Sequence, residues 1–267
     1  RHGLQQLGGC PEPLDHLVVN HGLALDWSGG VNQDARPLPP VPQPARRAGP
    51  GPAGPVPIGR RLHVVDNAAF FDLDRTLLRG ASGPVFSTEL KRAGLLPDRS
   101  IPGEGLVFKV FDVIGETIPS MLATRQMARA ASGWERAKVQ AAGVASVAPL
   151  MAAVPGFAKQ LIEGRKVVMA TTSPYDLVAP LARALEMDDV IATRYGVLDG
   201  RYDGSVDGHF VWGPGKLAAV RDWATVNDVD VAISHAYSDS VYDLPLLNAV
   251  AHPTAVNPDP RLQIVAI

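Results

Sequence analysis

Two aspartates, Asp72 and Asp74, follow directly on the short apolar segment Ala68–Phe71 and are separated by one leucine. Because the segment is short, apolar and rich in aromatic residues, we expect it to be a buried strand. Side chains alternate along a strand, so both carboxylates leave its end on the same side. Two such carboxylates repel each other unless a cation or a shared proton lies between them. Mg²⁺ takes hard oxygen ligands and leaves coordination sites for a phosphate, so these residues predict metal-dependent phosphate chemistry.

A second predicted strand, over residues 166–170, ends in a run of hydroxyls that begins at Thr171. Pro174 can occupy the first turn of the helix that we expect next. A hydroxyl and free N–H groups at a strand-to-helix junction form a suitable seat for a phosphate. Without partners elsewhere in the chain, Thr171 would be an ordinary helix cap.

Two further candidates lie beyond residue 210. Lys216 follows Gly213-Pro214-Gly215 at the start of a predicted helix over 216–225, but Leu217 comes next, so this is not the GxxxxGK[ST] phosphate loop. Asp239 and Asp243 are four residues apart and follow a strand expected over 229–233. Taken singly, the lysine would be a solvated surface residue and the acids would favour a helix N-terminus.

Taken together and in this order, the stretches resemble the four motifs of the haloacid dehalogenase (HAD) superfamily of phosphohydrolases. The wording YSDSxxDLPLL resembles the subfamily IB, which contains the phosphoserine phosphatases (the SerB-like proteins). The matching residues are Asp72, Asp74 and Thr76 for DxDx(T/V), Thr171 for the Ser/Thr motif, Lys216 for the lysine motif, and Asp239 and Asp243 for DxxxD.

The resemblance implies a mechanism with two chemical steps. Asp72 attacks phosphorus and forms an aspartyl-phosphate, which divides one difficult displacement into two easier ones. Asp74 protonates the leaving oxygen and then deprotonates the hydrolytic water. Family likeness assigns the remaining roles as follows: Thr171 and Lys216 bind the phosphoryl oxygens, Mg²⁺ is the cofactor held by Asp72, the backbone carbonyl of Asp74 and Asp239, and Asp243 supports the metal site.

The substrate is expected to be a small organic phosphate ester, hydrolysed as a phosphomonoester. Phosphoserine phosphatases carry a cap glutamate soon after the first motif, whereas this chain has Ala81 there and no acid until Glu89. Arg79 and Phe86 follow the first motif closely, so we expect them at the cap hinge as substrate-specificity residues. Three alternatives stay open: a phosphoserine phosphatase proper, a phosphotransferase that uses the same intermediate, and a lipid-phosphate phosphatase associated with phospholipid synthesis.

The elements that position these residues alternate between strand and helix, which predicts a parallel sheet covered on both faces. The resemblance implies an α/β, Rossmann-like HAD core with a helical C1-type cap inserted after the first strand. We expect a Pro/Gly-rich disordered arm over 1–62, the core over 63–267 and the cap at about 77–155. Further expected elements are helices over 105–114, 118–131, 156–163, 175–186 and 241–247, a tightly packed helix pair within 141–158, strands near 190–192 and 249–255, and a hairpin that turns at Asp199-Gly200.

The composition of the chain narrows its partners. Its 267 residues carry a formal net charge of −2, which gives no electrostatic reason to expect nucleic acid. No segment resembles a signal peptide or a transmembrane helix. The single cysteine, Cys10, excludes an internal disulfide framework and suits a reducing, cytoplasmic compartment. A small-molecule phosphate ester is therefore the expected partner, and the oligomeric state is left open.

Overall fold

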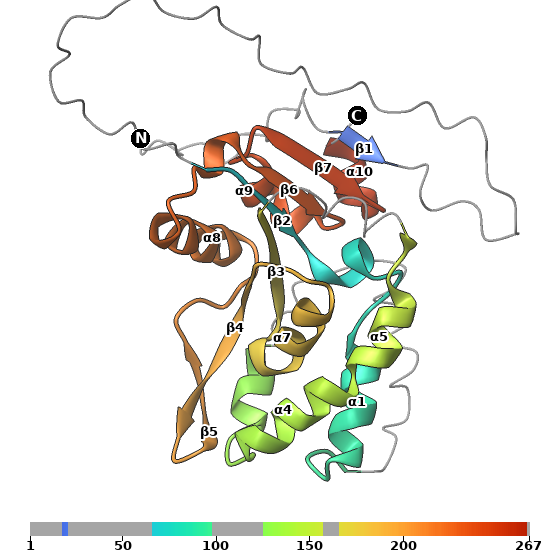
Figure 1. Cartoon of the computed structure of the whole chain (residues 1–267), viewed down its shortest axis with the longest axis vertical. Coiled ribbons are helices and arrows are strands. Elements are labelled where there is room, and N and C mark those ends of the chain that lie inside the picture. Colours follow the sequence, from blue (N-terminus) through green and yellow to red (C-terminus); the bar gives the residue numbers. More distant parts are fainter. Residues whose placement is uncertain (1–17, 21–65, 98–124, 157–165, 266–267) are drawn as a thin grey trace, which may run out of the picture.

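The strands of the computed structural model, which describes residues 18–20, 66–97, 125–156 and 166–265, form one seven-stranded sheet (Figure 1). Its order is β1-β7-β6-β2-β3-β4-β5. All neighbouring strands run parallel except β4 and β5, which pair antiparallel. The strands are β1 (Val18–Asn20), β2 (Ala68–Phe71), β3 (Lys166–Pro174), β4 (Asp189–Leu198), β5 (Arg201–Asp207), β6 (His235–Ser238) and β7 (His252–Val256).

Strand β2 lies inside the sheet, between β3 and β6, and all four of its side chains are buried. A parallel strand that is covered on both faces is expected to be continuously apolar, as this one is. Phe71 pairs with Met169 of β3 and with Tyr237 of β6. The residue that follows Phe71 therefore emerges at the carboxyl edge of the sheet, where ligand sites of open α/β sheets lie.

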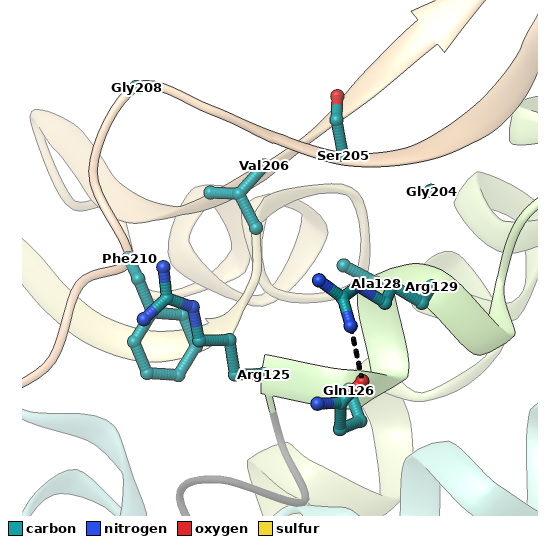
Figure 2. A pocket seen from close by; sticks show the side chains of 9 residues that line it. All are labelled: Arg125, Gln126, Ala128, Arg129, Gly204, Ser205, Val206, Gly208 and Phe210. Carbon is teal, nitrogen blue, oxygen red and sulfur yellow. Dashed lines mark hydrogen bonds between the residues drawn. The ribbon is translucent and has the colours of Figure 1, made fainter.

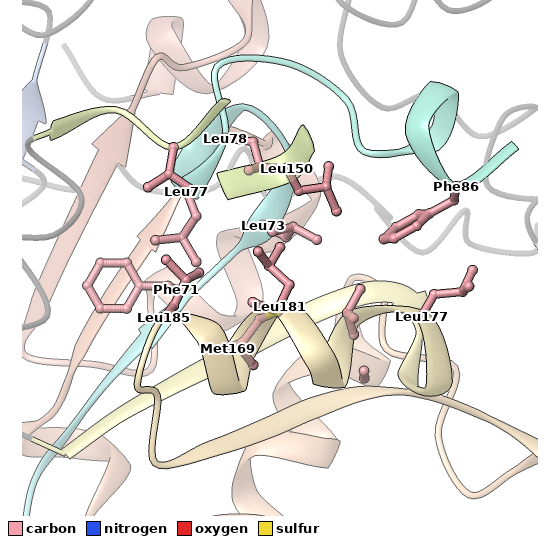
Figure 3. Close-up of a cluster of buried hydrophobic side chains, with 14 of the residues drawn as sticks. Phe71, Leu73, Leu77, Leu78, Phe86, Leu150, Met169, Leu177, Leu181 and Leu185 are labelled. Atoms are coloured by element: carbon pink, nitrogen blue, oxygen red, sulfur yellow. The ribbon is translucent and has the colours of Figure 1, made fainter. Parts of the chain in front are cut away.

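Helices cover both faces of the sheet, which confirms the predicted α/β class. On one face, Phe71 and Met169 pack with Leu177 and Leu181 of α7 and with apolar residues of the 77–155 region (Figure 3). On the other face, α8, α9 and α10 contribute apolar residues to a second cluster. The helices are α1 (Gly83–Arg92), α4 (Arg136–Ala145), α5 (Val147–Ala153), α7 (Tyr175–Ala184), α8 (Pro214–Val226), α9 (Leu244–Leu247) and α10 (Pro260–Val265), and residues 125–130 are also helical.

The helix pair predicted within 141–158 is present as α4 and α5. Helix α4 lies against α7 (Figure 1), and Gly143 of α4 comes close to the backbone of α7. A methyl group at Gly143 would lie 2.6 Å from the carbonyl oxygen of Asp176, so the backbones could not approach this closely with any other residue. The 77–155 region is thus docked on the helix that follows β3.

The predicted hairpin is also present, as β4 and β5. Its turn places Asp199 at φ 50° and Gly200 at φ 75°, the left-handed conformations that a two-residue hairpin turn requires. The first part of β4 pairs with β3, and the later part pairs with β5. The hairpin therefore extends past the carboxyl edge of the sheet, on the side where Asp72 emerges.

Two expectations are corrected by the structure. The strand expected over 229–233 is wrong: Val231–Ile233 is a 3₁₀ turn (η2), in which the Asp230 carboxylate accepts the N–H of Ala232, and the strand β6 begins only at His235. Within the stretch expected to be a disordered arm, Val18–Asn20 pairs with β7 as an edge strand. The rest of that arm, the helix expected over 105–114, all but Gly156 of the one over 156–163, and most of the one over 118–131 lie outside the described residues. Within the described residues, no helix has the length and apolar character needed to cross a membrane.

Candidate active site

The loop after β2 holds Asp72 at the carboxyl edge of the sheet. The N–H of Asp72 donates to the carbonyl of Tyr237 at 3.0 Å, which extends the pairing of β2 with β6. A wide turn follows (η1, Leu73–Leu77), closed by a 3.0 Å hydrogen bond from the N–H of Leu78 to the carbonyl of Leu73. Leu73 and Leu77 are buried, so they anchor the turn while its polar residues line the edge.

Asp74 lies within this turn in an extended conformation. Its Oδ1 accepts the N–H of Ser82 at 2.5 Å, and Ser82 comes immediately before α1. The carboxylate is thereby held at the junction between the sheet and the 77–155 region.

Lys216 joins two acidic side chains at the centre of the site. Its side chain is 1% exposed, and its Nζ lies 2.9 Å from Asp72 Oδ1 and 2.6 Å from Asp243 Oδ2. The hydroxyl of Ser238 also donates to Asp243 Oδ2, at 2.7 Å. A buried ammonium is tolerated only when it is paired and hydrogen-bonded, and these contacts supply both conditions.

Glycine is needed where α8 begins. A methyl group at Gly215 would lie 2.3 Å from the carbonyl oxygen of Phe210, so a larger residue would push the helix start away from the preceding segment. Val211 in that segment is tied to the sheet, since its carbonyl accepts the hydroxyl of Thr172 at 2.8 Å and its N–H donates to the hydroxyl of Thr193 at 3.1 Å. The Gly-Pro-Gly-Lys stretch thus places the lysine by close packing.

Thr171 lies at the carboxyl end of β3, beside Asp72 at the end of β2. It is 2% exposed, and its hydroxyl accepts the N–H of Ser173 at 3.2 Å. Because Met169 pairs with Phe71, the chain brings Thr171 to the same edge as Asp72. Strand β3 continues to Pro174, so Thr171 lies within the strand, and its part in binding phosphate stays a prediction.

Asp239 follows β6, at the same edge of the sheet as Asp72. Asp239 is 4% exposed, and its Oδ2 lies 2.9 Å from Nε of Arg75. Its backbone carbonyl accepts the N–H of Asp259 at 2.7 Å. Asp259 is fully buried and accepts the N–H groups of Val241, at 3.0 Å, and Leu262, at 2.8 Å. It ties the loop after β6 to the start of α10.

Neither Asp259 nor Arg75 was identified from the sequence. The only available signal for Asp259 is its place directly before Pro260, where an N-terminal helix cap is expected. Arg75 occupies a variable position between Asp74 and Thr76, which carries no signal of its own.

The donor set suits Mg²⁺ better than a metal that prefers nitrogen or sulfur ligands. Within the described residues, no three His, Cys, Asp or Glu side chains form a ready-made metal cage. A metal here would be held by two carboxylates together with backbone, phosphate or water oxygens, as Mg²⁺ usually is. One buried oxygen, Asp243 Oδ1, has no hydrogen-bond partner among the described residues, which fits a site that gains a polar group when occupied.

A second polar cluster, also missed from the sequence, joins the 77–155 region to the core. Asp176 on α7 accepts from Arg136 Nε at 2.8 Å, Gln140 Nε2 at 3.0 Å and the Tyr202 hydroxyl at 2.8 Å. Burial by itself would raise the pKa of Asp176, but these hydrogen bonds outweigh it and hold the pKa below its usual value. Burial and the bond to Asp176 raise the pKa of Tyr202, so the phenol stays a donor. The cluster fixes α4 against α7 and β5.

A cavity of about 280 Å³ lies between the helical residues 125–130 and the β4–β5 hairpin (Figure 2). The guanidinium of Arg125 lies 5.9 Å from the ring centre of Phe210, and Arg129 donates to Gln126 at 3.4 Å. Phe210 begins the segment that leads to Lys216, so the cavity neighbours the site without containing it. Its lining comprises Arg125, Gln126, Ala128, Arg129, Gly204, Ser205, Val206, Gly208 and Phe210.

The two residues expected to set specificity lie elsewhere. Phe86 is 5% exposed and packs in the apolar cluster of Figure 3. Arg79 is exposed, and its N–H donates to the carbonyl of Ala153 at 3.1 Å. Neither lines the cavity, and their effect on substrate choice stays a prediction. Glu89, the first acid after the initial motif, is paired with Arg92 at 2.5 Å.

Comparisons with known proteins find relatives that cover most of the chain. A family model described as haloacid dehalogenase-like hydrolase matches residues 69–248. A probable phosphatase of Mycobacterium tuberculosis is 34% identical over 229 residues, which cover 82% of this chain and 77% of that protein. Phosphoserine phosphatase SerB1 of the same species is 31% identical over 207 residues, covering 74% and 67%.

A solved structure of a phosphoserine phosphatase in its apo form matches with a TM-score of 0.52. It is 19% identical, and the match covers 75% of this chain and 91% of that one, so the likeness concerns the fold. The family match spans more than half of the chain and includes every motif residue of the cluster. The chain belongs to the haloacid dehalogenase-like hydrolase family.

Proposed function

We propose that this protein is a Mg²⁺-dependent phosphomonoester hydrolase that acts through an aspartyl-phosphate on a small organic phosphate. The observation that carries the proposal is the buried contact of Lys216 with both Asp72 and Asp243. A lysine between two carboxylates offsets part of their negative charge, and it places a positive charge where a phosphoryl group attached to Asp72 would develop negative charge.

In the first step, a carboxylate oxygen of Asp72 bonds to phosphorus while the bond from phosphorus to the ester oxygen breaks. Asp74 gives its proton to that leaving oxygen. In the second step, Asp74 takes a proton from water, the water oxygen bonds to phosphorus, and the bond to Asp72 breaks. Inorganic phosphate and the alcohol are released, and both aspartates return to their starting states.

We assign binding of the phosphoryl group to Thr171, toward the carboxyl end of β3, and to Lys216, in the first turn of α8. Asp72, the backbone carbonyl of Asp74 and Asp239 are the groups that would hold Mg²⁺, with Asp243 in support. The metal would supply charge neutralisation between nucleophile and phosphate, which matters because positioning and cations provide most of the acceleration in phosphoryl transfer.

The cavity beside Phe210 is our candidate for the organic part of the substrate. It presents two arginines and an aromatic ring, which suits an ester with a further polar or anionic group. Phosphoserine is the second candidate, because a relative of the chain is named a phosphoserine phosphatase. Against it, Ala81 provides no carboxylate for a substrate ammonium, and Glu89 is already paired with Arg92.

The function is tested by measuring phosphate release from a panel of esters by the full chain in the presence of Mg²⁺. The panel includes phosphoserine, lysophosphatidic acid and simple sugar phosphates, and added alcohols reveal any transfer to an acceptor. Asp72→Asn should lower turnover by at least about a thousandfold, on the order of 4 kcal/mol. Asp222→Asn is the matched control, because that carboxylate is exposed and pairs only with His209 among the described residues. Near-wild-type turnover by a folded Asp72→Asn protein would refute the mechanism.

A further inference from the structure

An arginine already occupies the carboxylate that the proposed metal site needs. Arg75 Nε lies 2.9 Å from Asp239 Oδ2, and the two side chains are 13% and 5% exposed. The pair is therefore almost entirely removed from water, where an attraction between opposite charges is far stronger than at the surface.

The backbone of Arg75 is held in a conformation that places its side chain here. Its φ is 60° and its ψ is −7°, a left-handed conformation that is uncommon for a residue with a long side chain. The N–H of Arg75 donates to Gly80 at 3.2 Å, and its carbonyl accepts Asn257 Nδ2 at 3.0 Å. Nη2 of Arg75 in turn donates to the carbonyl of Asn257 at 3.4 Å. Residues kept in such conformations are often tied to function.

A metal ion bound to Asp239 would lie within a few ångströms of this guanidinium. Two cations that close together in a shielded site repel each other, and the repulsion doubles when one is divalent. Asp239 therefore cannot bind Arg75 and Mg²⁺ together as strongly as it would bind either one alone.

We propose that Arg75 is a tethered cation that competes with Mg²⁺ for Asp239 and lowers the Mg²⁺ affinity of the protein. The inference rests on the proposed function, since it takes Asp239 as a metal ligand. Without metal, Arg75 neutralises a buried carboxylate and keeps the loops around η1 and β6 together. When Mg²⁺ binds, the ion pair is broken or weakened. The measured binding free energy is therefore that of Mg²⁺ with the carboxylates, reduced by the cost of separating Arg75 from Asp239.

The test measures Mg²⁺ binding by calorimetry, without substrate, for the wild type, Arg75→Gln and Arg75→Lys. Gln and Lys share the same backbone penalty at a positive φ, so their difference isolates the charge. We expect Arg75→Gln to bind Mg²⁺ at least about tenfold more tightly than the wild type, and Arg75→Lys to stay within about threefold. Arg92→Gln, which changes an exposed arginine on α1, should leave the affinity unchanged.

Thermal unfolding gives a second readout. In EDTA, Arg75→Gln should melt below Arg75→Lys, because the buried Asp239 loses the ion pair with residue 75, and Mg²⁺ should raise its melting temperature more than it raises that of the wild type. Unchanged or weaker Mg²⁺ binding by Arg75→Gln would overturn the inference and make Arg75 a residue that orients Asp239. Absence of Mg²⁺ binding in every variant would refute the metal site and this inference together. Metal binding that responds to Arg75 in a protein inactive on every ester would refute only the hydrolase.

Discussion

Replacement of Lys216 by methionine should damage both stability and turnover, because one ammonium serves two buried carboxylates. Methionine keeps most of the volume of the side chain, so cavity formation contributes little. What remains is Asp72 and Asp243 with side chains 10% and 1% exposed, and without the cation that lies between them. The substitution thus isolates the charge.

The size of the effect follows from the contacts. Removing one partner of a buried ion pair costs about 3–5 kcal/mol. The hydroxyl of Ser238 stays on Asp243 and offsets part of this, on the order of 1 kcal/mol. A net loss of about 3 kcal/mol lowers the melting temperature by roughly 10 °C in a domain of this size. Turnover should fall by at least about a thousandfold, since the proposed mechanism requires this cation at the phosphoryl oxygens.

Stability is measured by thermal and urea unfolding in EDTA, so that metal binding does not obscure the result. Lys138→Met is the matched control: its ammonium pairs with Glu135 at an exposed site, so the substitution should leave the stability nearly unchanged. The double variant Lys216→Met/Asp243→Asn removes one of the stranded charges, so it should regain part of the stability and none of the turnover. A single variant that melts within 2 °C of the wild type, where roughly 10 °C is expected, would refute the reasoning.

Three further outcomes are expected. Activity should disappear in EDTA and return with Mg²⁺ but not with Ca²⁺, whose larger and looser coordination shell misplaces the phosphate; full activity in EDTA would contradict a metal site. Asp176→Asn should cost stability at pH 7, and because the pKa of Asp176 is lowered in the fold, the gap to the wild type in urea unfolding should close as the pH falls below about 4; an equal gap at pH 3 would show that the charge is not involved. Replacing Arg125 and Arg129 by glutamine should raise KM for esters with a second anionic group more than it raises KM for p-nitrophenyl phosphate. Equal changes in KM for the two kinds of ester would show that the cavity does not select the substrate.

The gathering of the motif residues was predictable because parallel strands bring their carboxyl ends to one edge. Asp72 and Asp239 each follow a strand and Thr171 lies toward the carboxyl end of one, so an alternating pattern of strands and helices already places them at one edge. The position of β6 was not predictable in the same way. Val229–Ile233 is the more apolar run, but Asp230 caps a 3₁₀ turn there, and the strand is selected by its pairing with β2. Tertiary pairing decided between two adjacent segments of similar length.

Residues that act through distant partners left little trace in the sequence. Asp176 has the appearance of an acid in the first turn of a helix, where the helix dipole alone would explain it. Its partners Arg136 and Tyr202 come from α4 and β5, which are brought together only by the fold. The same holds for Asp259, whose role depends on the carbonyl of Asp239.

The contrast between Lys216, which is buried, and Arg75, whose side chain is 13% exposed, shows where this limit lies. Lys216 is recognisable because a helix start and close-packed glycines fix its place relative to Asp72, whatever the rest of the loop contains. The position of Arg75 depends on its positive φ and on its contacts with the backbone carbonyl and side-chain amide of Asn257, which directly follows β7. The local sequence around Arg75 specifies neither the φ nor these contacts. A cation fixed by its own element is always present for catalysis, whereas one held across two loops can be released. If the two differ in this way, Mg²⁺ should weaken the contact of Arg75 with Asp239 and leave that of Lys216 with Asp72 intact. The measurement is hydrogen exchange of the Arg75 and Lys216 side-chain N–H groups, with and without Mg²⁺. Faster exchange of Arg75 alone when Mg²⁺ is added would support the difference. An Arg75 whose protection Mg²⁺ leaves unchanged, like that of Lys216, would argue against its release.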